Sequence, residues 1–397
     1  MGLITPWAHQ EELAQAGILI LREYAICYLA MEERTGKTIT AIQMAERSTA
    51  FRVLIITKKK ALADWVNVLA NLPHIKIYQT VNYHQAHKIE GKFDLVILDE
   101  AHNYISSFPK VGAIWKAVAR LTKGLPIIYV SATPHAQGRA MMYHQFALSS
   151  WSPWRRYKNF YQWHKQYGYI YQVEVNGIMK NKYDRTDEDR IAAEITPMFI
   201  VKTRKELGFE HEPEDVLHYV ELSEETRGYY NTLVKDELVR LPEVFLVADS
   251  QPKMRFSLHQ LEGGTMKMDG EYYVLSNTEK VDYIRDRFGD TTDTVIMYNY
   301  KAELLKLERH FSNARLLQAT SYAEGIDLSG YSTLVIYSQD FSTARHTQRR
   351  ARQANMGRTD PIDVHYILVK KGISAQVYKT VSVKKKNFVD TVFERLV

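Results

Sequence analysis

Short apolar runs rich in β-branched and aromatic residues alternate with helical patterns through the first third of the chain. These runs are YAICYLA (24–30), FRVLIIT (51–57), HIKIYQT (74–80), FDLVILD (93–99) and LPIIYVSA (125–132). Continuous apolar runs are typical of strands buried on both faces, and the intervening helices can supply the crossovers that parallel strands need. We therefore predict an α/β unit with a parallel sheet over residues 1–150.

The same alternation returns toward the C-terminus. Its runs are DTVIMYN (293–299), ARLLQAT (314–320), STLVIYS (332–338) and DVHYILV (363–369). This pattern predicts a second α/β unit over residues 216–397, with a helix-like segment, ELSEETRGYYNTLVKDELVRL, at 221–241.

Residues 151–215 differ from both units and are interpreted as a helical, aromatic-rich linker or insert that closes the first lobe. WSPWRRYKNFYQWHKQYGYIY (151–171) is crowded with aromatic and basic residues. Such residues can stack on bases, as in single-strand binders. More often they pack in a core or between domains, and we favour packing for Trp151, Trp154, Arg155 and Arg156.

Composition narrows the class of protein. No apolar run in the 397 residues reaches the roughly 18–20 residues of a membrane span, so we expect no membrane segment. The single cysteine, Cys27, excludes intrachain disulfides, and we expect a cytoplasmic protein. The net charge of +6 fits a polyanionic partner, although an excess spread over the surface would serve only solubility.

Gly36-Lys37-Thr38 is the first candidate for chemistry. The triplet alone is weak evidence, because it arises by chance in roughly one chain of this length in five. It follows a predicted strand and precedes a helical pattern, which is the context of a phosphate-binding loop. In that context Lys37 would bind the β- and γ-phosphates and Thr38 would bind Mg²⁺.

Asp-Glu-Ala-His at the end of the run FDLVILD is a much rarer sequence. Asp99, at the carboxyl end of a predicted strand, is placed to hold Mg²⁺, and Glu100 to orient and deprotonate a water molecule. His102 would then report the nucleotide state to neighbouring elements. VSATP (130–134) follows another predicted strand and contains Ser131 and Thr133.

In this order and spacing, GKT, DEAH and SATP resemble motifs I, II and III of superfamily 2 helicases and translocases. The resemblance implies two RecA-like domains that close on ATP, with Ser131 and Thr133 in coupling roles. TPWAHQ (5–10) is similar to the adenine-reading element and would place Gln10 on the base. IITKKKALADW (55–65) looks like motif Ia, which would place Thr57 and Lys58 near a nucleic-acid backbone.

Other stretches extend the resemblance over nearly the whole chain. They are MFIVKTRKEL (198–207), VIMYNYKAEL (295–304), SYAEGIDLSGYSTLVIYS (321–338) and QRRARQANMGR (348–358). The set is most similar to the Swi/Snf-like branch, in its compact, often phage-encoded form. By this resemblance Gly325 and Asp327 would lie at the interdomain cleft, and Gln348 and Arg352 would face the nucleotide, with Arg352 as an arginine finger.

Three motifs depart from the family pattern. The phosphate loop has Arg34 and Thr35 where a further Gly is usual, which leaves it less permissive of positive φ. Asn355 occupies the second finger position, and Arg349, Arg350 and Arg358 remain alternatives for it. Lys58 stands where Pro is usual.

The sequence therefore predicts an ATP- and Mg²⁺-dependent nucleic-acid motor, with double-stranded DNA as the favoured track. A strand-separating DNA or RNA helicase and a nucleic-acid-binding scaffold with a weak ATPase remain alternatives. Two lobes in one chain complete the proposed cleft, so we expect a monomer in the cytoplasm, or in the host cytoplasm if the protein is phage-encoded.

Overall fold

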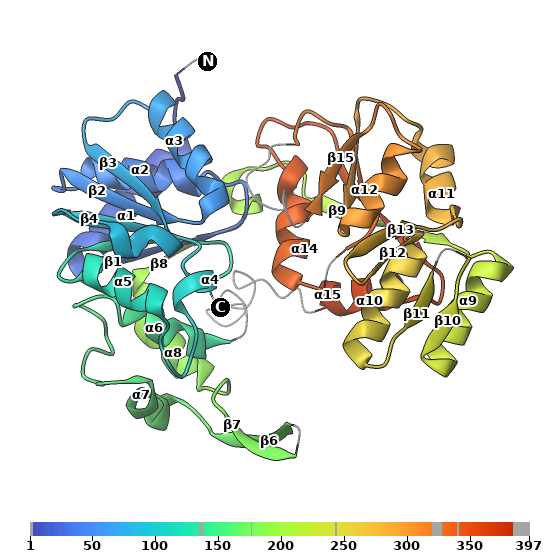
Figure 1. Ribbon diagram of the computed structural model, residues 1–397. Coiled ribbons are helices and arrows are strands. Elements are labelled where there is room, and N and C mark those ends of the chain that lie inside the picture. The colour runs from blue at the N-terminus through green and yellow to red at the C-terminus, as the bar shows by residue number, and fades with distance from the viewer. Residues whose placement is uncertain are drawn as a thin grey trace. The chain divides into compact units, whose positions relative to one another are not determined.

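The computed structural model describes residues 3–134, 138–175, 177–242, 244–319, 328–339 and 341–383. The chain forms two compact units that divide between Gly208 and Phe209. Each unit is built on a parallel sheet with helices packed against it (Figure 1).

The first unit contains a six-stranded sheet with the order β3-β2-β4-β5-β1-β8. Its strands are β1 (Ile26–Met31), β2 (Arg52–Thr57), β3 (Ile77–Asn82), β4 (Leu95–Asp99), β5 (Ile127–Val130) and β8 (Phe199–Lys202). All five strand pairs are parallel. The predicted parallel sheet is confirmed, and β8 is an additional edge strand that the apolar pattern did not indicate.

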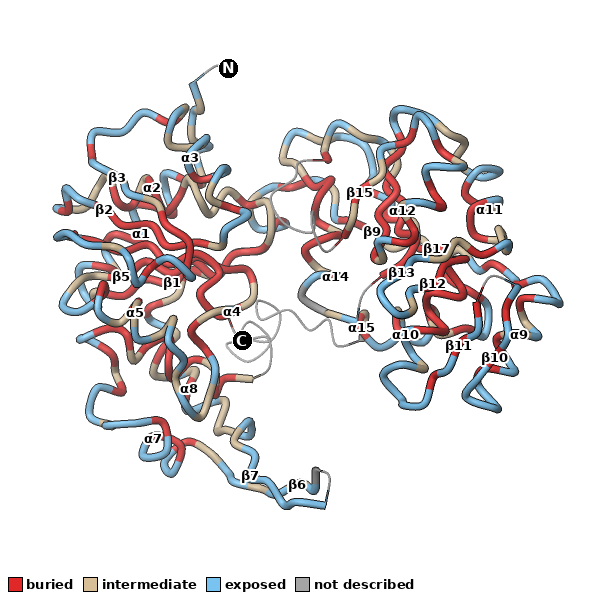
Figure 2. Tube along the Cα trace, in the orientation of Figure 1, coloured by how far each residue is buried: buried red, intermediate tan, exposed pale blue. Residues whose placement is uncertain are grey.

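Helices cover both faces of this sheet, because alternate strand residues point to opposite sides. In β1, Cys27 and Leu29 belong to one core cluster and Tyr28 to another. The first cluster includes α1 (Ala8–Tyr24), α2 (Lys37–Arg47) and α3 (Leu62–Asn71). The second includes α5 (Ala113–Thr122), α6 (Met142–Phe146), α7 (Phe160–Tyr167) and α8 (Glu188–Ile195). The strands between these layers are almost entirely buried (Figure 2).

The aromatic segment after residue 150 belongs to the first unit. Trp154 is buried in its core, and its indole Nε1 donates to Glu194 Oε2 at 2.7 Å. Trp151, Arg155 and Arg156 are exposed, so packing applies to Trp154 alone. Between α7 and α8 the strands β6 (Tyr171–Val175) and β7 (Ile178–Lys182) form an exposed antiparallel hairpin that projects from the unit (Figures 1 and 2).

The second unit contains a five-stranded parallel sheet with the order β15-β14-β16-β17-β9. Its strands are β9 (Pro213–Val220), β14 (Thr294–Tyr298), β15 (Arg315–Gln318), β16 (Thr333–Ile336) and β17 (Ile362–Val369). Helices α11 (Glu279–Phe288), α12 (Lys301–Glu308), α14 (Thr343–Arg350) and α15 (Ile373–Val383) accompany them. The second predicted α/β unit is confirmed, and both sheets have the architecture expected of RecA-like domains.

A small module with its own core lies in sequence between β9 and α11. It contains α9 (Glu224–Asp236), β10 (Leu238–Arg240), β11 (Phe245–Val247), α10 (Gln251–Glu262), β12 (Thr265–Met268) and β13 (Glu271–Val274). Among the described residues, the short 3-10 turns are Lys59–Ala61, Tyr83–Lys88, Arg139–Met141, Thr196–Met198, Lys205–Leu207 and Ala351–Gln353. Helix α4 (His102–Ile105) is one α-helical turn. Within the described ranges, no helix has the length and apolar character needed to traverse a bilayer.

Candidate active site

The motifs of the first unit meet at one edge of its sheet. Strands β4, β5, β1 and β8 are neighbours in that order and run parallel, so their carboxyl ends lie together. In parallel sheets of this kind ligands bind outside the carboxyl ends of the strands. The predicted phosphate loop, residues 32–36, follows β1, Glu100 follows β4, and Ser131 follows β5.

The phosphate loop adopts left-handed backbone conformations despite having one glycine. Gly36 has φ 81° and immediately precedes α2, and Arg34 has φ 69°. Arg34 thus takes the positive φ for which glycine is the usual residue. A Cβ on Gly36 would lie 1.9 Å from Gln10 Nε2. The buried Gln10 side chain, predicted to read adenine, therefore packs directly against the loop.

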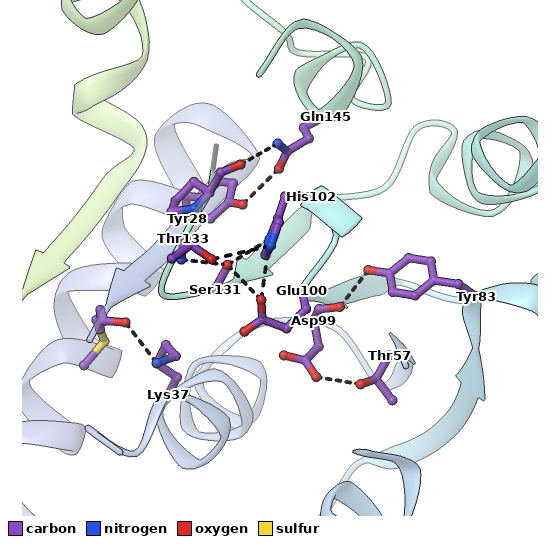
Figure 3. Close-up of polar contacts among 12 residues, drawn as sticks. Tyr28, Lys37, Thr57, Tyr83, Asp99, Glu100, His102, Ser131, Thr133 and Gln145 are labelled. Atoms are coloured by element: carbon purple, nitrogen blue, oxygen red, sulfur yellow. Dashed lines mark hydrogen bonds and ion pairs between the residues drawn. The ribbon is translucent and has the colours of Figure 1, made fainter. Parts of the chain in front are cut away.

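Lys37 is the first residue of α2, and its ammonium turns back over the loop. Its Nζ donates to the carbonyl oxygens of Met31 and Glu32, at 2.9 and 2.6 Å. Burial lowers the Lys37 pKa, and the nearby carboxylates of Glu33, Glu100 and Asp99 oppose that shift in part. Lys37 therefore lies within electrostatic reach of both acidic residues of the DEAH motif (Figure 3).

The first turn of α2 suits an anion. It carries no acidic side chain, and its leading N–H groups have no acceptor within the helix. Thr38 is half-buried in this turn. The loop and the helix start together offer backbone N–H groups, an ammonium and a hydroxyl to a phosphate group.

Asp99 is buried at the end of β4, and one of its two carboxylate oxygens accepts hydrogen bonds. Its Oδ2 accepts hydrogen bonds from Thr57 Oγ1 at 2.5 Å and Trp65 Nε1 at 3.0 Å. Burial raises the Asp99 pKa, and the neighbouring Glu100 charge raises it further, while the two hydrogen bonds and Lys58 act in the opposite direction. Among the described residues both bonds fall on Oδ2, which leaves Oδ1 for a ligand.

Thr57 and Lys58 are both predicted to lie near a nucleic-acid backbone, and they differ from each other in burial. Thr57 is fully buried, and its hydroxyl is used by Asp99, so the side chain offers no surface to a polymer here. Lys58 is half-buried and near enough to Asp99 to lower the pKa of that carboxyl.

Glu100, His102, Ser131 and Thr133 form one polar cluster (Figure 3). Ser131 Oγ donates to Glu100 Oε2 at 3.1 Å and lies 3.1 Å from His102 Nδ1, while His102 Nδ1 lies 3.5 Å from Glu100 Oε2. Thr133 joins through its backbone N–H, which donates to Ser131 Oγ at 3.0 Å. The structure therefore brings together the three residues predicted to couple nucleotide state to movement.

The backbone at Glu100 is itself unusual, with φ 50°. A left-handed conformation costs a residue with a Cβ about 1–2 kcal/mol. The bond from Glu100 N–H to the Val130 carbonyl, 2.8 Å long, and the side-chain bond from Ser131 hold it there.

Arg204 is a site residue that the sequence did not single out. It is buried beyond the end of β8, and its guanidinium lies 3.8 Å from the carboxylates of Glu32 and Glu33 in the phosphate loop. Its backbone N–H donates to Glu32 Oε2 at 2.7 Å. The place of Arg204 follows from the pairing of β1 with β8. Met31 lies opposite Lys202, so the residues that follow the two strands are neighbours.

In the second unit, Gln348 lies on α14 and Arg352 on the following 3-10 turn, and both are buried. Arg350 Nε donates to Asp215 Oδ1 at 2.5 Å, and Arg358 Nη1 donates to the Tyr331 carbonyl at 3.2 Å. These two alternatives for the second finger position are thus engaged within their own unit. Gly325 and Asp327 lie outside the described residues.

The donor set at the edge of the first sheet suits magnesium bound together with a nucleotide. Mg²⁺ in such sites takes one or two carboxylates, and substrate phosphates and water complete its shell. Asp99 Oδ1 and the Thr38 hydroxyl fit that requirement. In the described part of the chain no three His, Cys, Asp or Glu side chains gather as an all-protein metal site.

Comparisons with known proteins support the fold. No protein-family model and no curated protein matches the chain. A solved structure, the "ATP-dependent Type ISP restriction-modification enzyme LlaBIII bound to DNA", is similar with a TM-score of 0.53 and 12% identity over 98% of this chain. The matched region is 30% of that enzyme, so this chain spans less than a third of its length. At this identity the likeness shows a shared fold alone.

Proposed function

We propose that the protein is an ATP-dependent nucleic-acid motor, and specifically a double-stranded DNA translocase of the Swi/Snf-like type. The observation that carries the proposal is the convergence of Lys37, Asp99 and Glu100 at one sheet edge, with Glu100 bound to Ser131 beside His102. The loop at residues 32–36 matches the phosphate-loop motif only in part, yet its backbone is left-handed at Arg34 and Gly36, which supports the proposal further.

The residues of the first unit divide the work of hydrolysis. The α2 N-terminus and Lys37 bind the phosphates, and Gln10 lies beside the loop to bind the base. Thr38 and Asp99 hold Mg²⁺, which supplies charge neutralisation at the phosphates when bound. Glu100 orients and deprotonates the attacking water, because its carboxylate is fixed by Ser131 next to the phosphate loop.

The second unit contributes charge to the same reaction in this proposal. Arg352 acts as the arginine finger, with Gln348, Gly325 and Asp327 at the cleft, when the lobes close on ATP. Ser131, Thr133 and His102 link the position of Glu100 to that closure. Each cycle of closing and reopening advances the protein along DNA, which it holds chiefly by its phosphates.

Steady-state ATP hydrolysis without nucleic acid, and with duplex DNA, single-stranded DNA or RNA, tests the proposal. Lys37→Ala should lose ATP binding, whereas Glu100→Gln should bind ATP and lose at least about 100-fold in turnover. Stimulation by duplex DNA that both variants abolish is the expected result. Hydrolysis no faster than in the variants, despite nucleic-acid binding, would overturn the motor in favour of the scaffold.

The β6–β7 hairpin favours a second candidate, a strand-separating helicase. Ile178 and Met179 on this projecting ribbon are 62% and 56% exposed. Apolar side chains on a projecting element can wedge between bases. Displacement of a labelled strand by the wild type, lost in Ile178→Ser/Met179→Ser while ATP hydrolysis persists, would support the helicase, and no displacement by the wild type would exclude it.

A further inference from the structure

The first unit contains a cavity, with a volume of about 580 Å³, on the side covered by α5 and α6. A cavity of this size is within the range of small-molecule sites, about 300–1,000 Å³. Its wall includes the loop at 109–111, the start of α5, α6 and the segment 154–161. None of the motif residues assigned to ATP lines it.

The cavity is basic. Lys110, Lys116, Arg155 and Lys158 line it, and all four are exposed. Within the described ranges none of these four side chains takes part in an ion pair or a side-chain hydrogen bond, and no Asp or Glu is among the residues that line the cavity. Four cations that converge without a carboxylate repel one another, so an anion bound among them would be stabilised.

The cavity also offers aromatic surface. Trp115, Tyr157 and Tyr161 line it beside the cations, and Tyr161 is 39% exposed. The Trp115 ring is fixed in place, because its Nε1 donates to the His144 carbonyl at 2.7 Å. Aromatic side chains next to basic ones are the combination that binds bases by stacking and phosphates by charge.

We infer that this cavity binds a nucleobase with its adjoining phosphates, taken from single-stranded nucleic acid. That the ligand is a nucleic acid rests on the proposed nucleic-acid motor, whereas its single-stranded form and the site itself rest on the rings and cations that line the cavity, because stacking needs an unpaired base. Arginine can pair with a phosphate through two parallel hydrogen bonds and lysine as a point charge. The rings would provide the stacking surface for the base.

The cavity is connected to the ATP site through the chain. His144 Nδ1 lies 2.7 Å from the Ser107 carbonyl oxygen, and Ser107 follows the α4 turn that begins with His102. Residues 106–110 thus run from the Glu100 cluster to the rim of the cavity. A bound strand would therefore contact the segment that directly follows the DEAH motif.

The experiment measures binding of a fluorescein-labelled oligo(dT) to the full chain by anisotropy, without ATP and over a range of salt. Lys116→Ala/Arg155→Ala should weaken binding and lower the slope of log K against log salt by about 0.7 for each lost phosphate contact. Tyr161→Ala should weaken binding about 5-fold or more. Lys92→Ala/Lys123→Ala is the matched control, since both lysines are exposed on the same unit and neither lines the cavity.

Equal affinity and slope for the cavity and control variants would overturn the inference. A parallel titration with dTMP separates the two sources of the ligand: much weaker binding than oligo(dT) supports the polymer, and equal binding overturns that assignment in favour of a free mononucleotide. Because ATP is absent, a failure of the proposed ATPase leaves the result interpretable. An active, DNA-stimulated ATPase with normal binding by the cavity variants would overturn this inference alone.

Discussion

Thr57 Oγ1 donates to Asp99 Oδ2 at 2.5 Å, across the neighbouring strands β2 and β4. The register pairs Ile56 with Leu98, so the next residues on the two strands are brought together at the sheet edge. The hydroxyl thereby fixes the carboxylate that is proposed to hold Mg²⁺.

Replacing Thr57 by Val should reduce the unfolding free energy by about 1.5–3 kcal/mol, because a hydrogen bond to a charged group is lost inside the protein. It should also raise the Mg²⁺ concentration needed for half-maximal hydrolysis. Urea unfolding and a magnesium titration measure the two effects. Thr57→Ser keeps the hydroxyl and should behave like the wild type, and a Val variant with unchanged magnesium dependence would contradict the positioning role.

Asp99→Asn should abolish hydrolysis and stabilise the fold. Burial and Glu100 hold the Asp99 pKa above its ordinary value of 3.8. A raised carboxyl pKa favours the folded state when the group is protonated, and this contribution is lost as pH rises through the folded pKa. The higher unfolding free energy of the Asn variant relative to the wild type should therefore be absent below about pH 3.8 and grow as pH rises. Urea midpoints over a pH series test this, and a variant less stable at pH 8 would refute it.

Gly36→Ala should weaken ATP binding and destabilise the first unit. The positive φ alone costs about 1–2 kcal/mol, and the new methyl group would meet the Gln10 amide at 1.9 Å. The double variant Gly36→Ala/Gln10→Ala should recover the part of the lost stability that is due to this contact. Gly208→Ala is the control, because Gly208 has φ 83° and nothing within 4 Å of the added Cβ. Equal losses at Gly36 and Gly208 would exclude the contact as a cause.

Arg204→Gln should reduce both stability and ATP affinity. The carboxylates of Glu32 and Glu33 would lose their cation while remaining mostly buried, at a cost of about 1–3 kcal/mol, and they would repel a triphosphate. Adding Glu32→Gln should restore part of both quantities. Lys202→Gln removes the more exposed Lys202–Glu206 pair and should change stability by less than about 1 kcal/mol. Calorimetric titration with a non-hydrolysable ATP analogue and thermal unfolding compare the variants, and the absence of rescue would argue against charge as the cause.

The apolar pattern predicted most of the sheet architecture, because strands buried on both faces carry continuous apolar runs. It missed β8 and β9, which lie at sheet edges. Along β9, Glu214 and Tyr219 are exposed, so that strand lacks a continuous apolar run. Edge strands need fewer apolar residues, since one side has no neighbour to cover it.

The candidate site could be predicted only where motifs are local. Asp99 ends a predicted strand, Glu100 directly follows it, and the loop before Lys37 follows another, so their meeting was implied by a parallel sheet. The contact of Arg204 with the loop and the hydrogen bond from Trp65 to Asp99 depend on which elements are neighbours in space. No local sequence pattern specifies that arrangement. Thr57 was assigned to nucleic acid through its motif position, and only its hydrogen bond in the folded structure shows that the hydroxyl contacts Asp99.

In the proposed function, the two carbonyl groups that hold the Lys37 ammonium would compete with the phosphates of the nucleotide for it. A nucleotide whose phosphates bind Nζ must displace the carbonyl oxygens of Met31 and Glu32. The net gain in binding free energy is therefore the difference between the two sets of partners. Ligands with more negative charge at the terminal phosphate compensate that loss better. Lys37 should therefore add to affinity only for a ligand whose phosphates bind Nζ more strongly than these two carbonyls do, and it should stay on the carbonyls for any other.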